Sequence, residues 1–322
     1  MARSVADVAH LLQAIAGPDS RDPSAALKAV PDFSLGLTGD IRGLRIGVPR
    51  NYFFEMVDPE VVTAVRTAVA TMESLGAQIY EIELPACEHA SAASWAIAYT
   101  ESFAFHRDNF FARSRDYTPA FLHKITGAAC LSAEERVLAG RVRELTTTEF
   151  LAALQDVDVI LTPTTSYPCH PIDGPSPESL THSLTRAISL TGLPSLSLPC
   201  GFASGRLPVG MQLTGRAWEE STVLRLGHSY EQATRWSHHR APMNADENPP
   251  VHAQQPALAS AVDPQWILDY ARLTGLSFVT ADDAEPVAQS IGPQMTQLQR
   301  ARAIIEVGME PPVRPVRHNH FH

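Results

Sequence analysis

The chain has 322 residues, enough for one large domain and a smaller unit with a substantial buried core. Its formal net charge of -10 disfavours direct binding to nucleic acid, because such binding needs a surplus of Lys and Arg. No apolar stretch has the length that spans a bilayer, and the amphipathic start does not resemble a signal peptide. The four scattered cysteines indicate free thiols. We therefore expect a cytoplasmic protein without direct nucleic-acid or membrane contacts.

The N-terminal elements alternate between helix and strand. A start resembling a capping box predicts an amphipathic helix over residues 4–16. A short buried strand at 44–48, a helix at 58–76 and a strand at 78–82 follow. Asp58 is the expected N-cap of that helix, since a proline and an acidic residue come directly after it. This order favours an α/β layer architecture.

The middle of the chain has longer helices and then more strands. Residues 89–155 have a mostly helical pattern, and a compact apolar strand is predicted at 157–161. A loop rich in Pro, Ser and His covers 167–179. Strands at 195–199 and 209–213 are separated by turn residues, which predicts an antiparallel hairpin.

The composition changes after residue 240. Residues 241–262 are rich in Pro, Ala and Gln without periodicity, which predicts a linker. Residues 263–322 form a second unit with two amphipathic helices, the first capped by Asp263 and the second beginning at Thr280, and with an extended Pro-rich tail. Two such helices cannot bury both of their faces alone, so we expect this unit to dock on another surface.

Five segments of residues 1–240 resemble successive landmarks in the C-terminal portion of amidase-signature enzymes. They are MARSVADVAHLLQAIAGPDSRDP, GLRIGVPRNYF, VDVILTPTT, GLPSLSLPCGF and LPVGMQLTGRAWEESTVLRLGHSYEQAT. The resemblance implies a large mixed β-sheet flanked by helices. It also implies hydrolysis of a carboxamide C–N bond through a serine acyl-enzyme, in which a lysine and a serine in a cis peptide activate the nucleophilic serine.

The catalytic residues of that family have no counterparts in this chain. In the family, the loop with both serines precedes the segment that here begins at Met1, and the lysine lies further upstream. The chain has only Lys28 and Lys124, and neither follows an apolar strand as the family's lysine does. We therefore assign no catalytic residue here. We expect a truncated or split amidase whose 322 residues are inactive alone and whose sheet edge favours association.

Other catalytic chemistry finds little support in the sequence. Cys200 at a strand end is interpreted as a packed thiol rather than a nucleophile. Cys169, His170 and Asp173 are close together, but no second cluster completes a four-ligand metal site. We therefore predict no metal and no cofactor.

The resemblance also points to residues that contact the substrate, a small-molecule amide. In the family, the loop after the VDVILTPTT strand and the segment before GLP line the acyl pocket and its mouth. Arg186 is the best candidate for pairing with a substrate carboxylate, because guanidinium binds carboxylate bidentately. An ion pair of Arg186 with a nearby acidic residue is an equal alternative. The predicted substrate-binding residues are Thr164, Thr165, Tyr167, His182, Arg186 and Ser189, with His170 beside them.

The C-terminal unit resembles the small companion protein, normally a separate chain, that accompanies carboxybiuret hydrolase and the A subunits of tRNA amidotransferases. Three functions remain open: a split amidase, a non-catalytic assembly or binding partner of an intact amidase, and a component of a glutamine-dependent tRNA amidotransferase. The glutamine-binding acid and arginine of that enzyme align with His182 and the Leu122–His123 region. Because neither position carries an acid or an arginine, the alignment argues against glutaminase activity. Each alternative implies a protein partner or a homo-oligomer.

Overall fold

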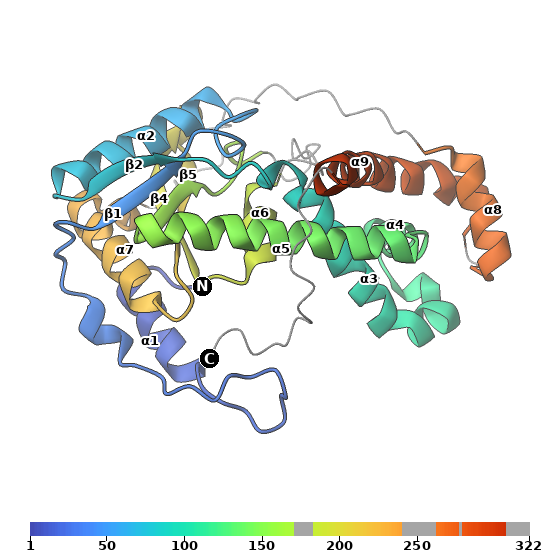
Figure 1. The fold of residues 1–322 in the computed structure, drawn as a ribbon, viewed down its shortest axis with the longest axis horizontal. Coiled ribbons are helices and arrows are strands. Elements are labelled where there is room, and N and C mark those ends of the chain that lie inside the picture. The colour runs from blue at the N-terminus through green and yellow to red at the C-terminus, as the bar shows by residue number, and fades with distance from the viewer. Residues whose placement is uncertain (171–182, 240–261, 277–278, 307–322) are drawn as a thin grey trace.

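The computed structural model describes residues 1–170, 183–239, 262–276 and 279–306. Their centre is a mixed sheet with the strand order β2-β1-β3-β5-β4 (Figure 1). β1 is parallel to β2 and β3, whereas β5 is antiparallel to β3 and β4. The α/β fold with a mixed sheet is thus confirmed. The strands are β1 (Arg45–Pro49), β2 (Gln78–Ile82), β3 (Val159–Pro163), β4 (Ser195–Ala203) and β5 (Leu207–Gly215).

The parallel pair β1–β2 is connected by the helix α2 (Pro59–Ser74), as expected. The Asp58 side chain accepts a hydrogen bond from the Glu60 N–H, and Pro59 occupies the first helical position, where its missing N–H costs nothing. Gly76 ends the helix at a φ of +97°, and a Cβ there would lie 2.6 Å from the Arg42 side chain. Both the backbone conformation and the space therefore require glycine.

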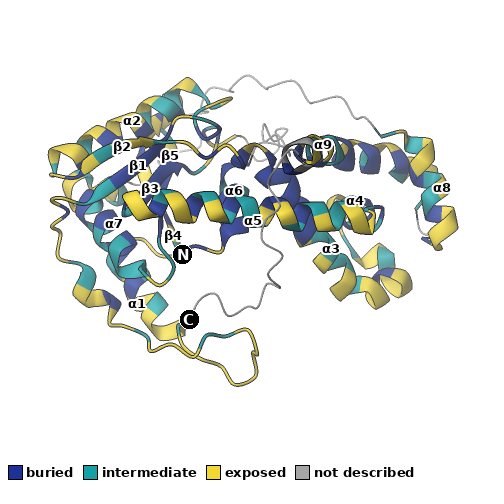
Figure 2. Cartoon of the chain, viewed as in Figure 1, coloured by how far each residue is buried: buried dark blue, intermediate teal, exposed yellow. Residues whose placement is uncertain are grey.

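The two faces of the sheet are covered by different helices. One apolar cluster joins the strands to α1 (Val5–Ile15), α2 and α7 (Glu220–Thr234). The other joins the opposite face to α3 (Cys87–Arg113), α5 (Ala133–Asp156) and α6 (Leu184–Thr191). Strands β1, β3 and β5 are largely buried, whereas α2 and α5 expose their outer sides (Figure 2). Short 3-10 turns lie at Phe33–Gly36, Ser114–Asp116, Ser204–Arg206 and Trp236–His238.

A charged network ties the start of β3 to β1. Asp158 accepts hydrogen bonds from the Arg45 N–H at 2.9 Å, from Arg45 Nη2 at 3.0 Å and from Arg216 Nη2 at 3.2 Å. Arg216 also donates to the carbonyls of Leu154 and Val157 at the end of α5. Burial by itself raises the pKa of Asp158, but the hydrogen bonds from the two arginines outweigh it and hold this pKa below its usual value.

The predicted strand at 157–161 begins two residues later, at Val159. The Val157 N–H still donates to Ala153 as the cap of α5, so the ladder to β1 starts only at Asp158, whose N–H donates to Arg45. Strands β4 and β5 are longer than expected because they pair through to the turn at 204–206, with a bulge between Pro199 and Gly201.

The two C-terminal helices pack on the amidase-like portion of the same chain. They are α8 (Pro264–Thr274) and α9 (Ala281–Glu306), and α9 contacts α3, α4 (Pro119–Ala129) and α5 (Figure 1). Ile291 of α9 fits against Gly127, where a Cβ would collide with the Ile291 side chain, and both lie beside Trp95. The expectation that this unit docks on another surface is met within the chain.

The N-terminal caps of these two helices lie at the residues that the sequence predicts. Asp263 caps α8, and the Asp283 carboxylate accepts from the Thr280 N–H and hydroxyl at the start of α9. The predicted linker at 241–262 lies, apart from its last residue, outside the described residues, as does the tail after Glu306. No helix in the described ranges is long and apolar enough to cross a membrane.

Candidate substrate-binding face

Side chains alternate between the two faces of the β3–β5–β4 part of the sheet. On one face the strands present apolar residues to α2 and α7. The register places polar side chains together on the other face, since Thr162 lies opposite Gln212, and Ser195 and Ser197 lie opposite Thr214 and Gln212. We call this set the hydroxyl face. It consists of Thr162, Thr164, Ser195, Ser197, Gln212 and Thr214, of which Thr164 directly follows β3 and contacts Ser197.

The hydroxyl face is buried at its centre and open at β4. Thr162 and Thr214 are fully buried, whereas Ser195 and Ser197 are exposed. The Thr162 hydroxyl has no hydrogen-bond partner in the described part of the chain. Gln212 Nε2 donates to the Pro163 carbonyl at 3.1 Å. A polar surface that starts inside the fold and ends at an open edge is suited to hold a polar ligand.

Two pairs of hydroxyls connect strands on this face, one between the neighbours β4 and β5 and one from the end of β3 across β5 to β4. Thr164 Oγ1 lies 2.8 Å from Ser197 Oγ, and Ser195 Oγ lies 3.2 Å from Thr214 Oγ1. Gly210 lies between Thr164 and Ser197, and a Cβ at this glycine would come within 3.1 Å of the Thr164 hydroxyl oxygen. The absence of a side chain at Gly210 therefore keeps the surface beside Thr164 open.

The loop after β3 carries three of the sequence-predicted residues. The Thr165 hydroxyl donates to the Tyr167 carbonyl at 2.9 Å, and the Ser166 carbonyl accepts from the Asp58 N–H at 2.9 Å. The loop is therefore fixed to the start of α2. Thr164 and Tyr167 are half-buried, and burial together with the nearby Asp58 raises the pKa of the Tyr167 hydroxyl.

Arg186 lies in the first turn of α6, half-buried and close to Tyr52. Burial and, to a smaller degree, Cys87 raise the pKa of Tyr52, and the charge of Arg186 opposes this effect. The Tyr52 hydroxyl donates to the Ser183 carbonyl at 3.3 Å, directly before α6. Ser189 is exposed on the same helix. His182, another predicted substrate-binding residue, lies outside the described residues.

Three of the four cysteines are buried thiols. Burial raises the pKa of Cys87 well above its usual value and the pKa of Cys130 and Cys200 to about 12. Cys200 Sγ donates to the Val209 carbonyl. Buried thiols of this kind stay protonated and unreactive, so the interpretation of Cys200 as a packed thiol is confirmed. Cys169 is exposed.

The two lysines lie next to aromatic rings. Lys28 Nζ is 4.9 Å from the centre of the Trp218 ring, and Lys124 Nζ is 5.9 Å from that of Tyr99. Among the residues that the structure describes, no three His, Cys, Asp or Glu side chains form a metal-binding group. His123 pairs with Asp283 of α9 at 3.4 Å, which places the Leu122–His123 region in the α4–α9 contact.

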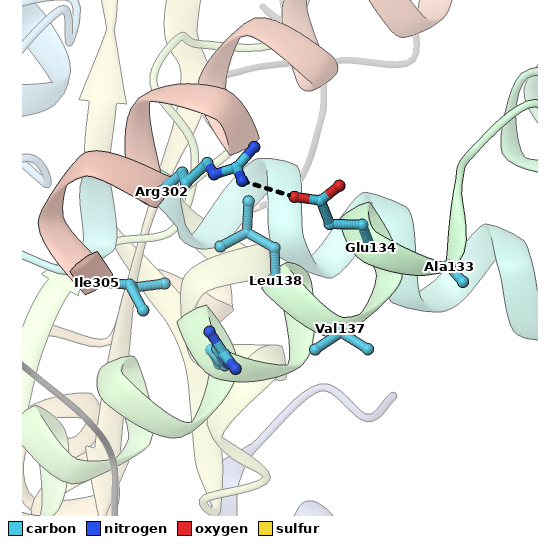
Figure 3. Close-up of a pocket in the computed structure, with 7 residues that line it drawn as sticks. Ala133, Glu134, Val137, Leu138, Arg302 and Ile305 are labelled. Atoms are coloured by element: carbon cyan, nitrogen blue, oxygen red, sulfur yellow. Dashed lines mark ion pairs between the residues drawn. The ribbon is translucent and has the colours of Figure 1, made fainter.

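A separate hollow of about 410 Å³ lies between α5 and α9 (Figure 3). Val137, Leu138 and Ile305 form apolar walls, and an ion pair of 3.0 Å between Arg302 and Glu134 closes one side. It shares no residue with the hydroxyl face.

The sequence pattern predicts the position of Thr164 at the end of a strand. It does not predict the contacts of Thr164 with Ser197 on β4 and with Gly210 on β5. The signal was present in the alternation of Ser195, Leu196, Ser197 and Leu198, which places both serines on one face. The pairing of Ser197 with Thr164 depends on the strand register, which the sequence alone does not provide.

Comparison with known proteins shows the family to which the chain belongs. Residues 1–224 match the family model described as Amidase. The chain belongs to the amidase family. Its resemblance to amidase-signature enzymes is thereby confirmed.

Curated relatives of this amidase-family chain include the A subunit of glutamyl-tRNA(Gln) amidotransferase from Roseiflexus sp. (strain RS-1), 39% identical over 269 residues that cover 75% of this chain and 55% of the relative. An amidase of Pseudomonas putida is 37% identical over 250 residues, or 74% of this chain and 53% of the relative. The chain thus spans about half the length of the curated relatives that it matches.

Solved structures of similar fold include a protein complex described as vestigial, which reveals the evolutionary origins of an s-triazine catabolic enzyme. Its TM-score is 0.65 at 26% identity, over 72% of this chain and 52% of that one. The A subunit of glutamyl-tRNA(Gln) amidotransferase from Thermotoga maritima has a TM-score of 0.57 at 26% identity, over 71% and 51% of the two chains. A bacterial aryl acylamidase of the amidase-signature family has the same fold, with a TM-score of 0.62 at 23% identity over 73% and 52% of the chains.

Proposed function

We propose that this chain forms the substrate-binding wall of an amide hydrolase that works through a serine acyl-enzyme. The nucleophilic serine, its serine partner and the lysine lie outside these 322 residues in this proposal, so the chain alone is inactive. The observation that carries it is the hydroxyl face, which opens at β4 beside the Thr164–Tyr167 loop.

The partners of the two exposed serines support this proposal. A serine nucleophile needs a base within hydrogen-bond reach. Ser197 is paired with the Thr164 hydroxyl, and Ser195 with that of Thr214, neither of which is a base at neutral pH. Both lysines lie against aromatic rings. Ser195 and Ser197 are therefore suited to hold a substrate rather than to attack it.

The proposed substrate is a small-molecule amide. Thr164 and Ser197 supply hydroxyls that can donate to or accept from an amide, and Thr165, Tyr167 and Ser189 lie on the neighbouring loop and helix. Arg186 and His182 complete the proposed set. Arg186 would pair with a carboxylate on the substrate. It lies on α6, close to Tyr52, and is half-buried. An ion pair at a half-buried position is stronger than the same pair in water.

An assay with small aryl amides tests this proposal. We expect no hydrolysis above background by the purified chain alone. Hydrolysis should appear when the chain is co-expressed with the part of the Pseudomonas putida amidase that its match leaves uncovered. In that complex, Arg186→Gln should raise the KM of a carboxylate-bearing amide and leave that of a neutral amide unchanged. Turnover by the chain alone contradicts the proposal.

The amidotransferase alternative rests on the 39% identity to the A subunit of that enzyme. Under it, the chain would act in a larger assembly, and purification from native cells would recover the other amidotransferase subunits. The contact of His123 with Asp283 speaks against a role of His123 in binding glutamine.

The alternative of a non-catalytic assembly partner would use the companion-like helices to dock on an intact amidase. In this chain α9 already packs against α3, α4 and α5, so docking in trans would first have to displace it. Recovery of an intact amidase in stable complex with this chain would favour this alternative.

A further inference from the structure

The helix α6, which carries Arg186 and Ser189, is held at both of its ends by side chains from other parts of the fold. It has only eight residues. A helix of this length is not stable by itself, so its place depends on tertiary contacts. Its apolar side is buried against α3 and α5. Arg186 and Ser189 lie together on the outer side, because they are three positions apart.

The first turn of α6 is fixed by Tyr52, a residue of the distant loop after β1. The Ser183 carbonyl accepts hydrogen bonds from the Arg186 N–H at 3.2 Å and from the Tyr52 hydroxyl at 3.3 Å. The Ser183 side chain makes no capping hydrogen bond within the part of the chain that the structure describes. The turn that carries Arg186 and the hydroxyl of Tyr52 therefore meet at one carbonyl oxygen.

The last turn of α6 is fixed in a similar manner by α5. Arg143 Nε donates to the Leu190 carbonyl at 3.1 Å. This carbonyl is one of the last four in the helix, which cannot find a partner in the helix itself. Gly192 then ends the helix in the left-handed conformation, with a φ of +72°. Arg143 therefore acts at the end of α6 that lies opposite to Tyr52.

Tyr52 is itself held rigidly. Only 3% of its surface is exposed, and it lies 131 residues before Ser183 in the sequence. Its φ of +54° is costly for a residue with a Cβ and persists only where the surrounding structure determines it. Its ring packs edge-on against Phe53 at 5.1 Å, and Phe53 packs against Phe150 of α5 at 6.5 Å. Tyr52 is thus a rigid point to which the start of α6 is attached.

We propose that Tyr52 and Arg143 are positioning residues that fix the two ends of α6 and so direct Arg186 toward the carboxylate of the substrate. The inference rests on the proposed function, in which Arg186 pairs with that carboxylate. A guanidinium binds a carboxylate through two parallel hydrogen bonds, which requires a correct orientation. Loss of either contact lets the short helix shift, so it weakens this pairing more than it weakens contacts to the rest of the substrate.

A simpler alternative is that the Tyr52 hydroxyl only satisfies its own burial, as buried tyrosine hydroxyls usually do. Tyr230 provides the comparison. Its buried hydroxyl donates to the Cys200 carbonyl at 3.4 Å, within the apolar cluster on the other face of the sheet. Under this alternative, Tyr52→Phe and Tyr230→Phe act alike, because both lower the stability and leave ligand binding unchanged.

Binding of two amides to the purified full chain tests the inference, with chemical shifts in NMR spectra as the readout. The probes are hippurate, a small amide with a carboxylate, and hippuramide, its neutral analogue. We expect Tyr52→Phe to raise the Kd of hippurate about five-fold and to leave that of hippuramide unchanged. Tyr230→Phe should change neither. Equal effects of the two variants, an equal effect on the two probes, or no binding of hippurate by the parent overturns the inference.

Arg143 provides a second test with a conservative rescue. Arg143→Leu removes the donor at the Leu190 carbonyl, whereas Arg143→Lys retains a donor. We expect Arg143→Leu to raise the Kd of hippurate about three-fold and Arg143→Lys to restore most of the affinity. Arg141→Leu is the matched control, since it removes the same charge from α5 at the hollow beside α9. Equal effects of Arg143→Leu and Arg141→Leu would refute the assignment of Arg143.

Kinetics separate this inference from the proposed function. In the complex with the remaining part of the Pseudomonas putida amidase, Tyr52→Phe should raise the KM of a carboxylate-bearing amide and leave kcat and the KM of a neutral amide unchanged. Hippurate binding that depends on Tyr52, without hydrolysis in any complex, leaves the positioning role standing and refutes the function. Hydrolysis with a carboxylate preference that does not depend on Tyr52 refutes the positioning role alone.

Discussion

The two faces of the same strands, β3, β5 and β4, have opposite characters. One face carries Leu196, Leu198, Met211 and Leu213, which are buried under α2 and α7. The other carries threonines, serines and Gln212, and it is open at β4. Burial of apolar surface stabilises the fold, whereas polar side chains at an opening add little to its stability and are available for binding. The comparison separates the part of the sheet that stabilises the protein from the part that we assign to function.

The largest effect is expected on the apolar face. Leu213→Ala removes a fully buried side chain from the cluster beneath α7 and leaves a cavity. We expect the free energy of unfolding to fall by about 2–5 kcal/mol. Chemical denaturation measures it, with Ser197→Ala on the hydroxyl face as the control. A loss for Leu213→Ala as small as that of the control would mean that the two faces do not differ in their contribution to stability.

The second effect concerns the network that ties β1 to the start of β3. Asp158→Asn removes a charge that accepts from Arg45 and Arg216, and we expect a loss of about 1–2 kcal/mol at neutral pH. The pKa of Asp158 is lowered by folding, so its stabilisation is complete above the unfolded value of about 3.9 and disappears as the pH falls through the lower folded value.

This dependence on pH provides the control for the same variant. The parent protein should lose its advantage over Asp158→Asn as the pH falls below about 4, because the carboxyl group then becomes protonated. Denaturation curves at several pH values measure the difference between the two proteins. A difference that stays constant from neutral to acidic pH would show that the charge of Asp158 is not the cause.

A smaller effect of opposite sign is expected at the buried centre of the hydroxyl face. Thr162→Val replaces a buried hydroxyl that lacks a partner among the described residues with a methyl group of similar size. We expect the stability to stay unchanged or to rise by up to about 1 kcal/mol, since an unsatisfied buried hydroxyl is costly. A loss of stability would show that Thr162 has a hydrogen-bond partner in solution.

The smallest effect on stability is expected at the open end of the face. Thr164→Val breaks the hydroxyl pair with Ser197, and we expect a change within about 1 kcal/mol. In the complemented enzyme, the same variant should raise the KM for amides several-fold. Unchanged kinetics would remove Thr164 from the substrate-binding set. Thr67→Val on the outer side of α2, where the hydroxyl bonds only to its own helix, is the matched control.

Much of the fold could be read from local patterns. The caps at Asp58 and Asp263 and the glycine at 76 fix their helix ends through interactions within a few residues, so the sequence contains them. The end of α5 differs because Val157 can either cap the helix or start the strand, and the contact of Asp158 with distant Arg45 and Arg216 decides between the two. Long-range contacts of this type are absent from a local pattern.

The residues of the candidate site also differ in whether a local sequence pattern or a long-range contact determines their position. Thr164 was predicted because it follows an apolar strand with a family-like sequence. Ser197 and Gln212 were missed because their place on the same face results from the register of β4 on β5 and of β5 on β3. The sequence predicts that the C-terminal helices dock on another surface. It does not predict the contact of α9 with Gly127 and Trp95, because these residues are far away from α9 in the sequence.

The most direct test of the central claim is to locate the nucleophile. A fluorophosphonate probe labels activated serines covalently, and mass spectrometry identifies the labelled residue. We expect no label on the 322-residue chain, either alone or in complex with the remaining part of the Pseudomonas putida amidase. A label should appear on a serine of that remaining part, and only in the complex. A label on any serine of this chain, above all on Ser195 or Ser197, would contradict the assignment of the hydroxyl face to substrate binding.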